Sequence, residues 1–146
     1  MLHLGCTYFA VRDMEKSKAF YKQLLEMEPT AQNHNRWVEF SFEGQCIALY
    51  NNQYDEDMMR QGKDLDKHYN QAYREYFVSK EICYGNQAIL NFWIEDLNAE
   101  YIRLKKLNIG KVSEILYVNI KMPYYYFNIE DPDGNVIEIT GHYDIM

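Results

Sequence analysis

Apolar and polar positions in the first fifty residues predict a strand, a helix and a hairpin. Residues 3–11 are apolar and β-prone, and Asp13 behind them is a good helix N-cap. The helix predicted from Asp13 carries an apolar stripe and ends by Pro29. Two more strands, between residues 36 and 50, are joined by Glu43-Gly44, which is a hairpin signal.

The last sixty residues predict the same elements in the same order. Asp96 is the N-cap of a helix that follows a strand, and Gly110 is the expected stop of that helix. Pro132-Asp133-Gly134 predicts the final turn, because proline presets φ and glycine accepts a positive φ. The strands are expected at residues 88–95, 111–118, 124–130 and 136–140.

This likeness indicates an internal duplication. Aligning Asp13 with Asp96 superposes apolar positions at an offset of 83 residues, and aligning Gly44 with Gly134 does so at an offset of 90. We therefore predict a repeated strand-helix-strand-strand-strand module. The modules cover residues 1–52 and 86–146 of a single domain that spans residues 1–146.

Residues 53–85 form a polar, charged insertion between the modules. A helical run is expected near residues 64–78, with aromatic side chains at helical spacing on one side. These side chains are Tyr69, Tyr73, Tyr76 and Phe77. Two interpretations remain open: a linker helix whose aromatic face packs on a sheet, or a lid over a pocket.

Composition narrows the function classes. The 146 residues are 47% hydrophobic, which excludes intrinsic disorder, and 14 are tyrosines. The net charge of −7 argues against nucleic acids and anionic membranes as partners, and weakly favours a cationic ligand. We find no 18-residue apolar run and no signal-peptide pattern. Cys6, Cys46 and Cys83 are odd in number and widely spaced, which predicts free thiols and a cytoplasmic location.

Three segments carry a family resemblance: TYFAVRDMEKSKAFYKQLLEM from Thr7, FNIEDPDGNVIEITG from Phe127, and more weakly LNFWIEDLNAEYIRLKKLNI from Leu90. The chain resembles the vicinal oxygen chelate superfamily, which includes glyoxalase I, extradiol dioxygenases, and fosfomycin- and bleomycin-resistance proteins. The resemblance implies an α+β fold of two βαβββ modules that form an incomplete, curved mixed β-barrel around a cleft. It also implies a homodimer.

Strand alternation assigns one face of each strand to the core and the other to this cleft. Tyr124, Tyr125 and Tyr126 alternate in the same way, but the sequence leaves open which of them meets the cleft. The predicted ligand-binding residues are Cys6, Tyr8, Ala48, Tyr50, Asn91, Trp93, Tyr126 and Glu138.

Metal enzymes of the family place ligands at four equivalent strand positions, which here hold Cys6, Ala48, Ile89 and Glu138. Only Glu138 is a side chain of the ligand type, so it is also the only candidate catalytic residue. Cys6 is expected to be a small buried apolar residue. We therefore expect no cofactor, unless the insertion, for instance through His68, or a dimer partner supplies further ligands to a divalent metal.

Three functions are consistent with these features. The first is metal-free binding of a small aromatic, possibly cationic, molecule, as in the bleomycin-resistance branch. The second is a metal-dependent lyase, isomerase or dioxygenase that uses Glu138 as base or ligand. The third is a structural or regulatory dimer module whose cleft is filled by its own side chains.

Overall fold

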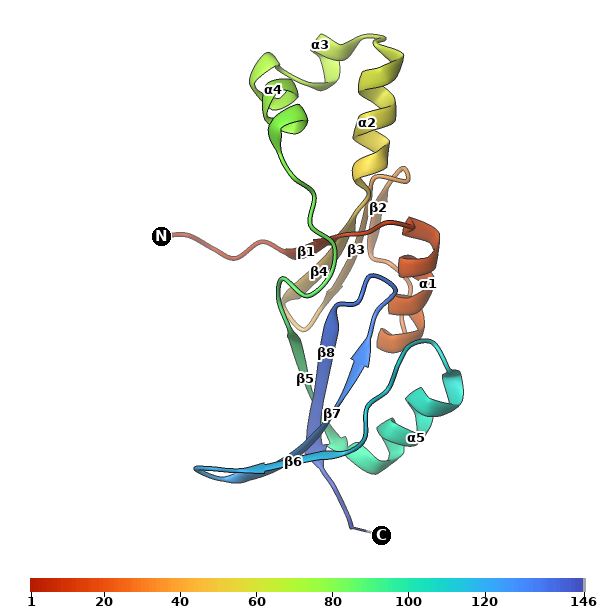
Figure 1. The fold of residues 1–146 in the computed structure, drawn as a ribbon, viewed down its shortest axis with the longest axis vertical. Helices are drawn as coiled ribbons and strands as arrows, with labels where there is room; N and C mark the ends of the chain where they lie inside the picture. Colours follow the sequence, from red (N-terminus) through yellow and green to blue (C-terminus); the bar gives the residue numbers. More distant parts are fainter. Residues whose placement is uncertain (146) are drawn as a thin grey trace. The chain divides into compact units, whose positions relative to one another are not determined.

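The computed structural model describes residues 1–145 and contains the duplicated order of elements (Figure 1). The first module consists of β1 (Thr7–Ala10), α1 (Met14–Leu25), β2 (Ala31–Asn33), β3 (Trp37–Phe42) and β4 (Gln45–Tyr50). The second consists of β5 (Leu90–Asp96), α5 (Leu97–Leu107), β6 (Leu116–Asn119), β7 (Pro123–Glu130) and β8 (Val136–His142). The predicted βαβββ modules and α+β class are confirmed.

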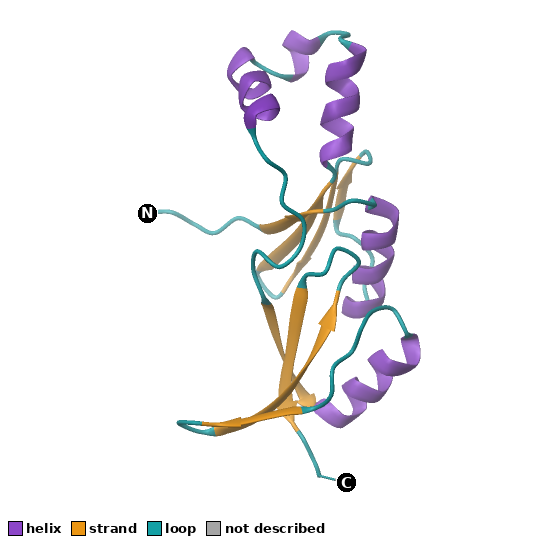
Figure 2. Ribbon diagram, viewed as in Figure 1, coloured by secondary structure: helices purple, strands orange, loops and turns teal. Residues whose placement is uncertain are grey.

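Each module builds one four-stranded mixed sheet (Figure 2). The strand orders are β1-β4-β3-β2 and β5-β8-β7-β6, and in each sheet only the first pair is parallel. The pairing of Tyr8 with Ala48 in the first sheet matches that of Asn91 with Glu138 in the second. The two sheets therefore repeat in register as well as in topology.

The chain divides into two compact units, residues 1–18 with 27–84 and residues 19–26 with 85–146. The second half of α1 thus belongs with the second module. There the fully buried Tyr21 donates its hydroxyl to Asp131 Oδ2 at 2.7 Å. Arg103 of α5 also donates to backbone carbonyls at the end of α1. The boundary between the two compact units therefore passes through α1 as well as through the end of the insertion.

Local signals in the sequence explain most element ends. The carboxylates of Asp13 and Asp96 accept from backbone N–H groups of the first helical turns, as N-caps do. Glu43 and Gly44 both have positive φ, which matches the twist of a two-residue hairpin. The predicted stop at Gly110 is wrong, because α5 ends earlier, at a left-handed Asn108.

The insertion contains three helices, α2 (Asn52–Gln61), α3 (Leu65–His68) and α4 (Gln71–Ser79). Figure 1 shows them between β4 and the loop that leads to β5. The single helical run predicted over residues 64–78 is wrong. Asn70 interrupts it by accepting a hydrogen bond from the Tyr73 backbone N–H, which starts α4. The sequence reading also missed α2, whose N-cap is Asn51.

Burial alternates as predicted along β3, β7 and β8, but not along β4, where Ile47, Ala48, Leu49 and Tyr50 are all buried. Phe9 and Leu49 are buried in the first sheet, and Ile137 and Ile139 in the second. No helix within residues 1–145 is long and apolar enough to span a membrane. The core faces of the sheets are thus set by the period-two pattern of the strands.

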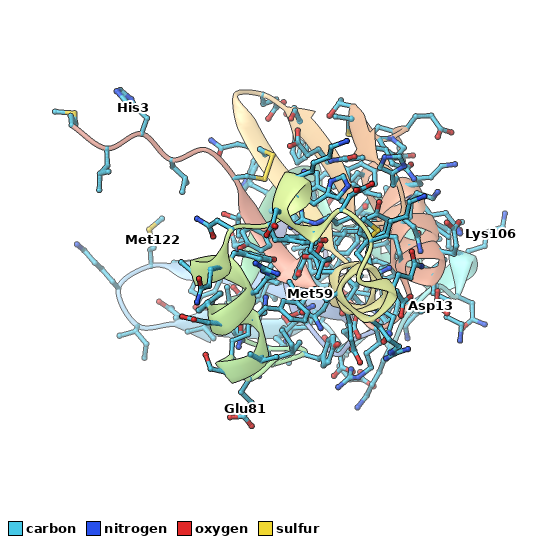
Figure 3. The ribbon with its side chains drawn as sticks, turned by 90° about the horizontal axis from the view of Figure 1, so that it is seen from above. His3, Asp13, Met59, Glu81, Lys106 and Met122 are labelled. Atoms are coloured by element: carbon cyan, nitrogen blue, oxygen red, sulfur yellow. A yellow bond between two sulfur atoms is a disulfide. The ribbon has the colours of Figure 1, made fainter. Side chains whose placement is uncertain are left out.

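The prediction of free thiols is wrong for two of the three cysteines. Cys6 and Cys46 form a disulfide, the yellow bond in Figure 3, and Cys83 is free and exposed. The parallel register that pairs Tyr8 with Ala48 sets the two cysteines side by side, with Cα atoms 4.7 Å apart. A separation of 40 residues hid this proximity from the sequence.

Candidate functional site

The face of the first sheet opposite the core carries aromatic side chains. Trp37 pairs with Tyr50 across β3 and β4, and Tyr8 stands beside them on β1. The ring of Tyr8 lies 4.9 Å from that of Trp37 and 6.3 Å from that of Tyr50, both edge-on. Ala48 of β4, which pairs with Tyr8 of β1, is fully buried. This face therefore offers ring surface, and the one carboxylate that pairs with Ala48 in register, Glu39, accepts from the Trp37 indole N–H.

A buried carboxylate on α2, that of Asp55, is joined to this aromatic face by a hydrogen bond from Tyr50. Asp55 has no exposed surface, and Arg36 binds it through two hydrogen bonds. The guanidinium Nε lies 2.8 Å from Oδ1, and Nη2 lies 3.1 Å from Oδ2. This bidentate arrangement compensates the buried charge and fixes α2 against the start of β3.

Three tyrosine hydroxyls also donate hydrogen bonds to the carboxylate of Asp55. Tyr50 of β4 and Tyr73 of α4 donate to Oδ2 at 2.7 and 2.9 Å, and Tyr69 donates to Oδ1 at 2.7 Å. Residues Arg36, Tyr50, Asp55, Tyr69 and Tyr73 are called the Asp55 cluster below. The cluster ties the insertion to the first sheet through hydrogen bonds as well as ring packing.

The charges and hydrogen bonds of the Asp55 cluster favour an ionised Asp55 and neutral tyrosines. Burial opposes ionisation of Asp55, but the hydrogen bonds from the guanidinium and the tyrosines outweigh it and lower its pKa to about 2. Burial and the neighbouring carboxylate raise the pKa of Tyr50 and Tyr69 above the usual value. The carboxylate is therefore ionised at neutral pH, and these two tyrosines are neutral donors.

A cavity of about 300 Å³ lies over the aromatic face. The sheet and the insertion both contribute to it. The Lys80 ammonium, just after α4, lies 4.8 to 5.5 Å from the ring centroids of Tyr50, Tyr76 and Phe77. The lining residues are Tyr8, Arg36, Trp37, Tyr50, Tyr73, Tyr76 and Lys80. We call this space the aromatic cavity.

A second, wider cavity of about 640 Å³ adjoins the insertion. It shares Arg36 and Tyr73 with the aromatic cavity. His34 and His68 line it, and both are exposed. The remaining lining residues are Asn33, Tyr54, Met58, Tyr69 and Asn70. Its walls are thus more polar than those of the aromatic cavity.

The equivalent face of the second sheet combines hydrogen-bonded polar side chains with aromatic ones. Asn91 of β5 donates to Glu138 Oε1 at 3.3 Å and to Thr140 Oγ1 at 3.1 Å. Tyr126 pairs with Thr140 and therefore shares this face, whereas Tyr125 points to the other side. Trp93 is 71% exposed. Of the tyrosine run, Tyr124 and Tyr126 therefore lie on the same face of the sheet as Thr140 and Glu138.

The predicted site residues fall into two groups. Tyr8 and Tyr50 line the aromatic cavity, with Ala48 buried beneath and Cys6 in the disulfide. Asn91, Trp93, Tyr126 and Glu138 belong to the equivalent face of the second sheet.

Sequence reasoning missed five residues in or next to the aromatic cavity: Arg36, Trp37, Asp55, Tyr73 as a hydrogen-bond donor, and Lys80. Alternation along β3 could have found Trp37, because it pairs with Tyr50. No local pattern marks Asp55, whose partners lie up to 19 residues away.

Comparison with known families agrees with this duplicated fold. The model of the Glyoxalase/Bleomycin resistance protein/Dioxygenase superfamily matches residues 2–139. The chain belongs to this superfamily. A search of curated proteins finds no match. The resemblance drawn from the sequence motifs is therefore confirmed at the level of the superfamily.

Solved structures of glyoxalase-like proteins have the same fold. A lactoylglutathione lyase from Agrobacterium tumefaciens is 18% identical, with a TM-score of 0.65 over 95% of this chain and 92% of its own. A glyoxalase-related enzyme from Fulvimarina pelagi is 14% identical, with a TM-score of 0.66 over 97% and 89%. A glyoxalase/bleomycin resistance protein from Albidiferax ferrireducens is 17% identical, with a TM-score of 0.61 over 95% and 98%. At these identities the likeness concerns the fold.

The donor set of this superfamily member does not fit a divalent metal. Of the four strand positions at which the family resemblance implies metal ligands, Cys6 has its sulfur in a disulfide, and Ala48 and Ile89 have no side-chain donor atom. Glu138 alone supplies an oxygen, and that oxygen accepts from Asn91. No group of three or more His, Cys, Asp or Glu side chains within residues 1–145 is placed to hold a metal ion. No catalytic step through a metal is therefore derived.

Proposed function

We propose that this superfamily member binds a small flat aromatic molecule in the aromatic cavity without a metal. The observation that carries the proposal is the lining of that cavity. Four tyrosines and Trp37 surround about 300 Å³, at the lower end of the roughly 300–1,000 Å³ usual for ligand pockets. Binding of this kind needs no catalytic residue, as in the bleomycin-resistance branch of the superfamily.

The chemistry of the walls supports an aromatic ligand. Tyr8 stands edge-on to both Trp37 and Tyr50, so an inserted ring meets faces and edges at once. Each well-placed aromatic pair contributes about 0.5–1.5 kcal/mol beyond the area it buries. A ligand of one or two rings can make two or three such contacts, and each of them contributes to its binding.

Pre-organisation of the walls also supports binding. The hydroxyls of Tyr50 and Tyr73 donate to the buried carboxylate of Asp55, and these hydrogen bonds fix the positions of the two rings. Trp37 is held as well, since its indole N–H donates to Glu39 Oε1 at 2.8 Å. A ligand that enters such a cavity pays little to order the side chains around it.

The two tryptophans supply the experiment. Trp37 lines the aromatic cavity, while Trp93 lies exposed on the second sheet. In a Trp93→Phe variant the tryptophan emission comes from Trp37 alone, and in a Trp37→Phe variant from Trp93 alone. Both variants are titrated with flat aromatic compounds that are neutral, anionic or cationic.

We expect a saturable change of emission in the Trp93→Phe variant and none in the matched Trp37→Phe variant. Thermal unfolding of the unmodified protein should shift upward with the same compounds. If no compound of any charge changes the Trp37 emission or the unfolding temperature, the proposal is wrong. That outcome would instead favour the interpretation of a structural module.

A further inference from the structure

The charges around the aromatic cavity point to the class of ligand. Arg36 and Lys80 are the charged residues of its lining, and both are cations. Arg36 is already neutralised, because both its Nε and its Nη2 are bonded to Asp55. Among residues 1–145, no carboxylate forms an ion pair with Lys80. The cavity therefore contains one positive charge without a counterion.

The position of Lys80 directs that charge into the cavity. Its backbone N–H donates to Tyr76 O and closes the end of α4, which fixes the base of the side chain. Its ammonium lies 5.1 Å from the Tyr50 ring centroid and 4.8 Å from that of Phe77, within the range of cation–π attraction. In Figure 3, Glu81 marks the adjacent point where the chain leaves α4.

The aromatic rings compensate only part of the solvation that the Lys80 ammonium loses on burial. Burial lowers the pKa of Lys80, and the nearby Arg36 lowers it further, although Asp55 acts in the opposite direction. An anionic ligand group beside Lys80 would restore the counterion that the described residues do not supply. A cationic ligand would have to displace Lys80 from the rings or lie against a like charge.

We propose that the ligand of the aromatic cavity is a planar aromatic carboxylate whose anionic group pairs with Lys80 while its ring packs among Tyr8, Trp37 and Tyr50. The inference rests on the proposed binding function and specifies the ligand. It departs from the sequence-based suggestion of a cation, which depends on the net charge and on Glu138. Glu138 is not part of this lining.

Benzoate, benzamide and benzamidine test the proposal, since they share one ring and nearly one shape but differ in charge. Their affinities are measured through Trp37 emission in the Trp93→Phe variant. We expect benzoate to bind at least about tenfold more tightly than benzamide, with benzamidine weakest. If benzamidine binds more tightly than benzoate, the proposal is overturned. If none of the three binds, it is the proposed binding function that fails.

Lys80→Met provides the second measurement, because methionine keeps much of the length and removes the charge. In this variant the affinity for benzoate should fall about tenfold, while that for benzamide stays within about twofold. Lys67→Met is the matched control, since Lys67 is an exposed lysine of α3 outside the cavity lining. An unchanged ratio of benzoate to benzamide affinity in Lys80→Met would refute the role of Lys80. Retained benzamide binding shows that the variant is folded.

Discussion

The two modules place different chemistry at the same positions of the same sheet. The strand pairings make Tyr8, Ala48 and Tyr50 in the first sheet equivalent to Asn91, Glu138 and Thr140 in the second. The first set offers rings and a methyl group, and the second is linked by hydrogen bonds from Asn91. At these three positions one topology thus supports aromatic and apolar side chains in one module and polar side chains in the other.

The two carboxylates illustrate the difference most clearly. Asp55 comes from the insertion, is fully buried, and accepts hydrogen bonds from four side chains. Glu138 is part of β8, is partly exposed, and accepts one hydrogen bond, from Asn91. The sequence reading considered only Glu138, because the family resemblance directed attention to the strands. The carboxylate that is buried and has more hydrogen-bond donors around it therefore belongs to the insertion.

The largest effect is expected from the disulfide, which only the first module has. The double variant Cys6→Ala/Cys46→Ala should lower the free energy of unfolding by about 3–4 kcal/mol. A cross-link over 40 residues restricts the unfolded chain by about that amount. Urea denaturation measures the change, and Cys83→Ala, at an exposed free cysteine, is the control with an expected change within about 0.5 kcal/mol. Alkylation of all three cysteines without reductant would contradict the bond.

The next effect separates the two carboxylates. Asp55→Asn should lower the free energy of unfolding by about 3 kcal/mol, because it removes one partner of a buried ion pair. Glu138→Gln, the matched change in the second module, should shift it by no more than about 0.5 kcal/mol, since an amide oxygen can still accept from Asn91. Chemical denaturation of both variants makes the comparison. Equal losses would show that the contrast between the modules is wrong.

The smallest effect is a dependence on acid. The pKa of Asp55 in the folded protein is about 2, below the ordinary value of 3.8, so the unfolded chain takes up this proton first as the pH falls. The contribution of Asp55 is therefore complete above about pH 4 and is lost as the pH falls toward 2. It amounts to about 2 kcal/mol. Urea midpoints measured from pH 6 to pH 2 should show this slope, and Asp55→Asn should lack it.

Much of the fold was predictable from the sequence because its causes are local. Asp13 and Asp96 cap the helices that follow them, and Glu43-Gly44 turns a hairpin, whatever the rest of the chain does. The period-two alternation then placed Phe9, Leu49, Ile137 and Ile139 in the core. The break at Asn70 was missed, because Tyr69 and Tyr73 keep a helical spacing across it.

The candidate site was predictable only in part. Tyr8 and Tyr50, which alternation assigned to the face of the first sheet opposite the core, both line the aromatic cavity, although Tyr50 is buried. Alternation could not select Asp55 or Lys80, because both belong to the insertion, whose path over the sheet has no local signal. Metal-free binding, the homodimer and the compartment stay predictions.

The sequence by itself determined the duplicated modules, the core faces of the strands and the superfamily, because periodicity, caps and turns act over a few residues and repeat at fixed offsets. Tertiary structure alone decided which side chains meet. It joined Cys6 to Cys46 and brought Arg36, Tyr50, Tyr69 and Tyr73 around Asp55. A buried charge needs partners from whichever segments lie beside it, and chain topology, rather than local pattern, determines those segments.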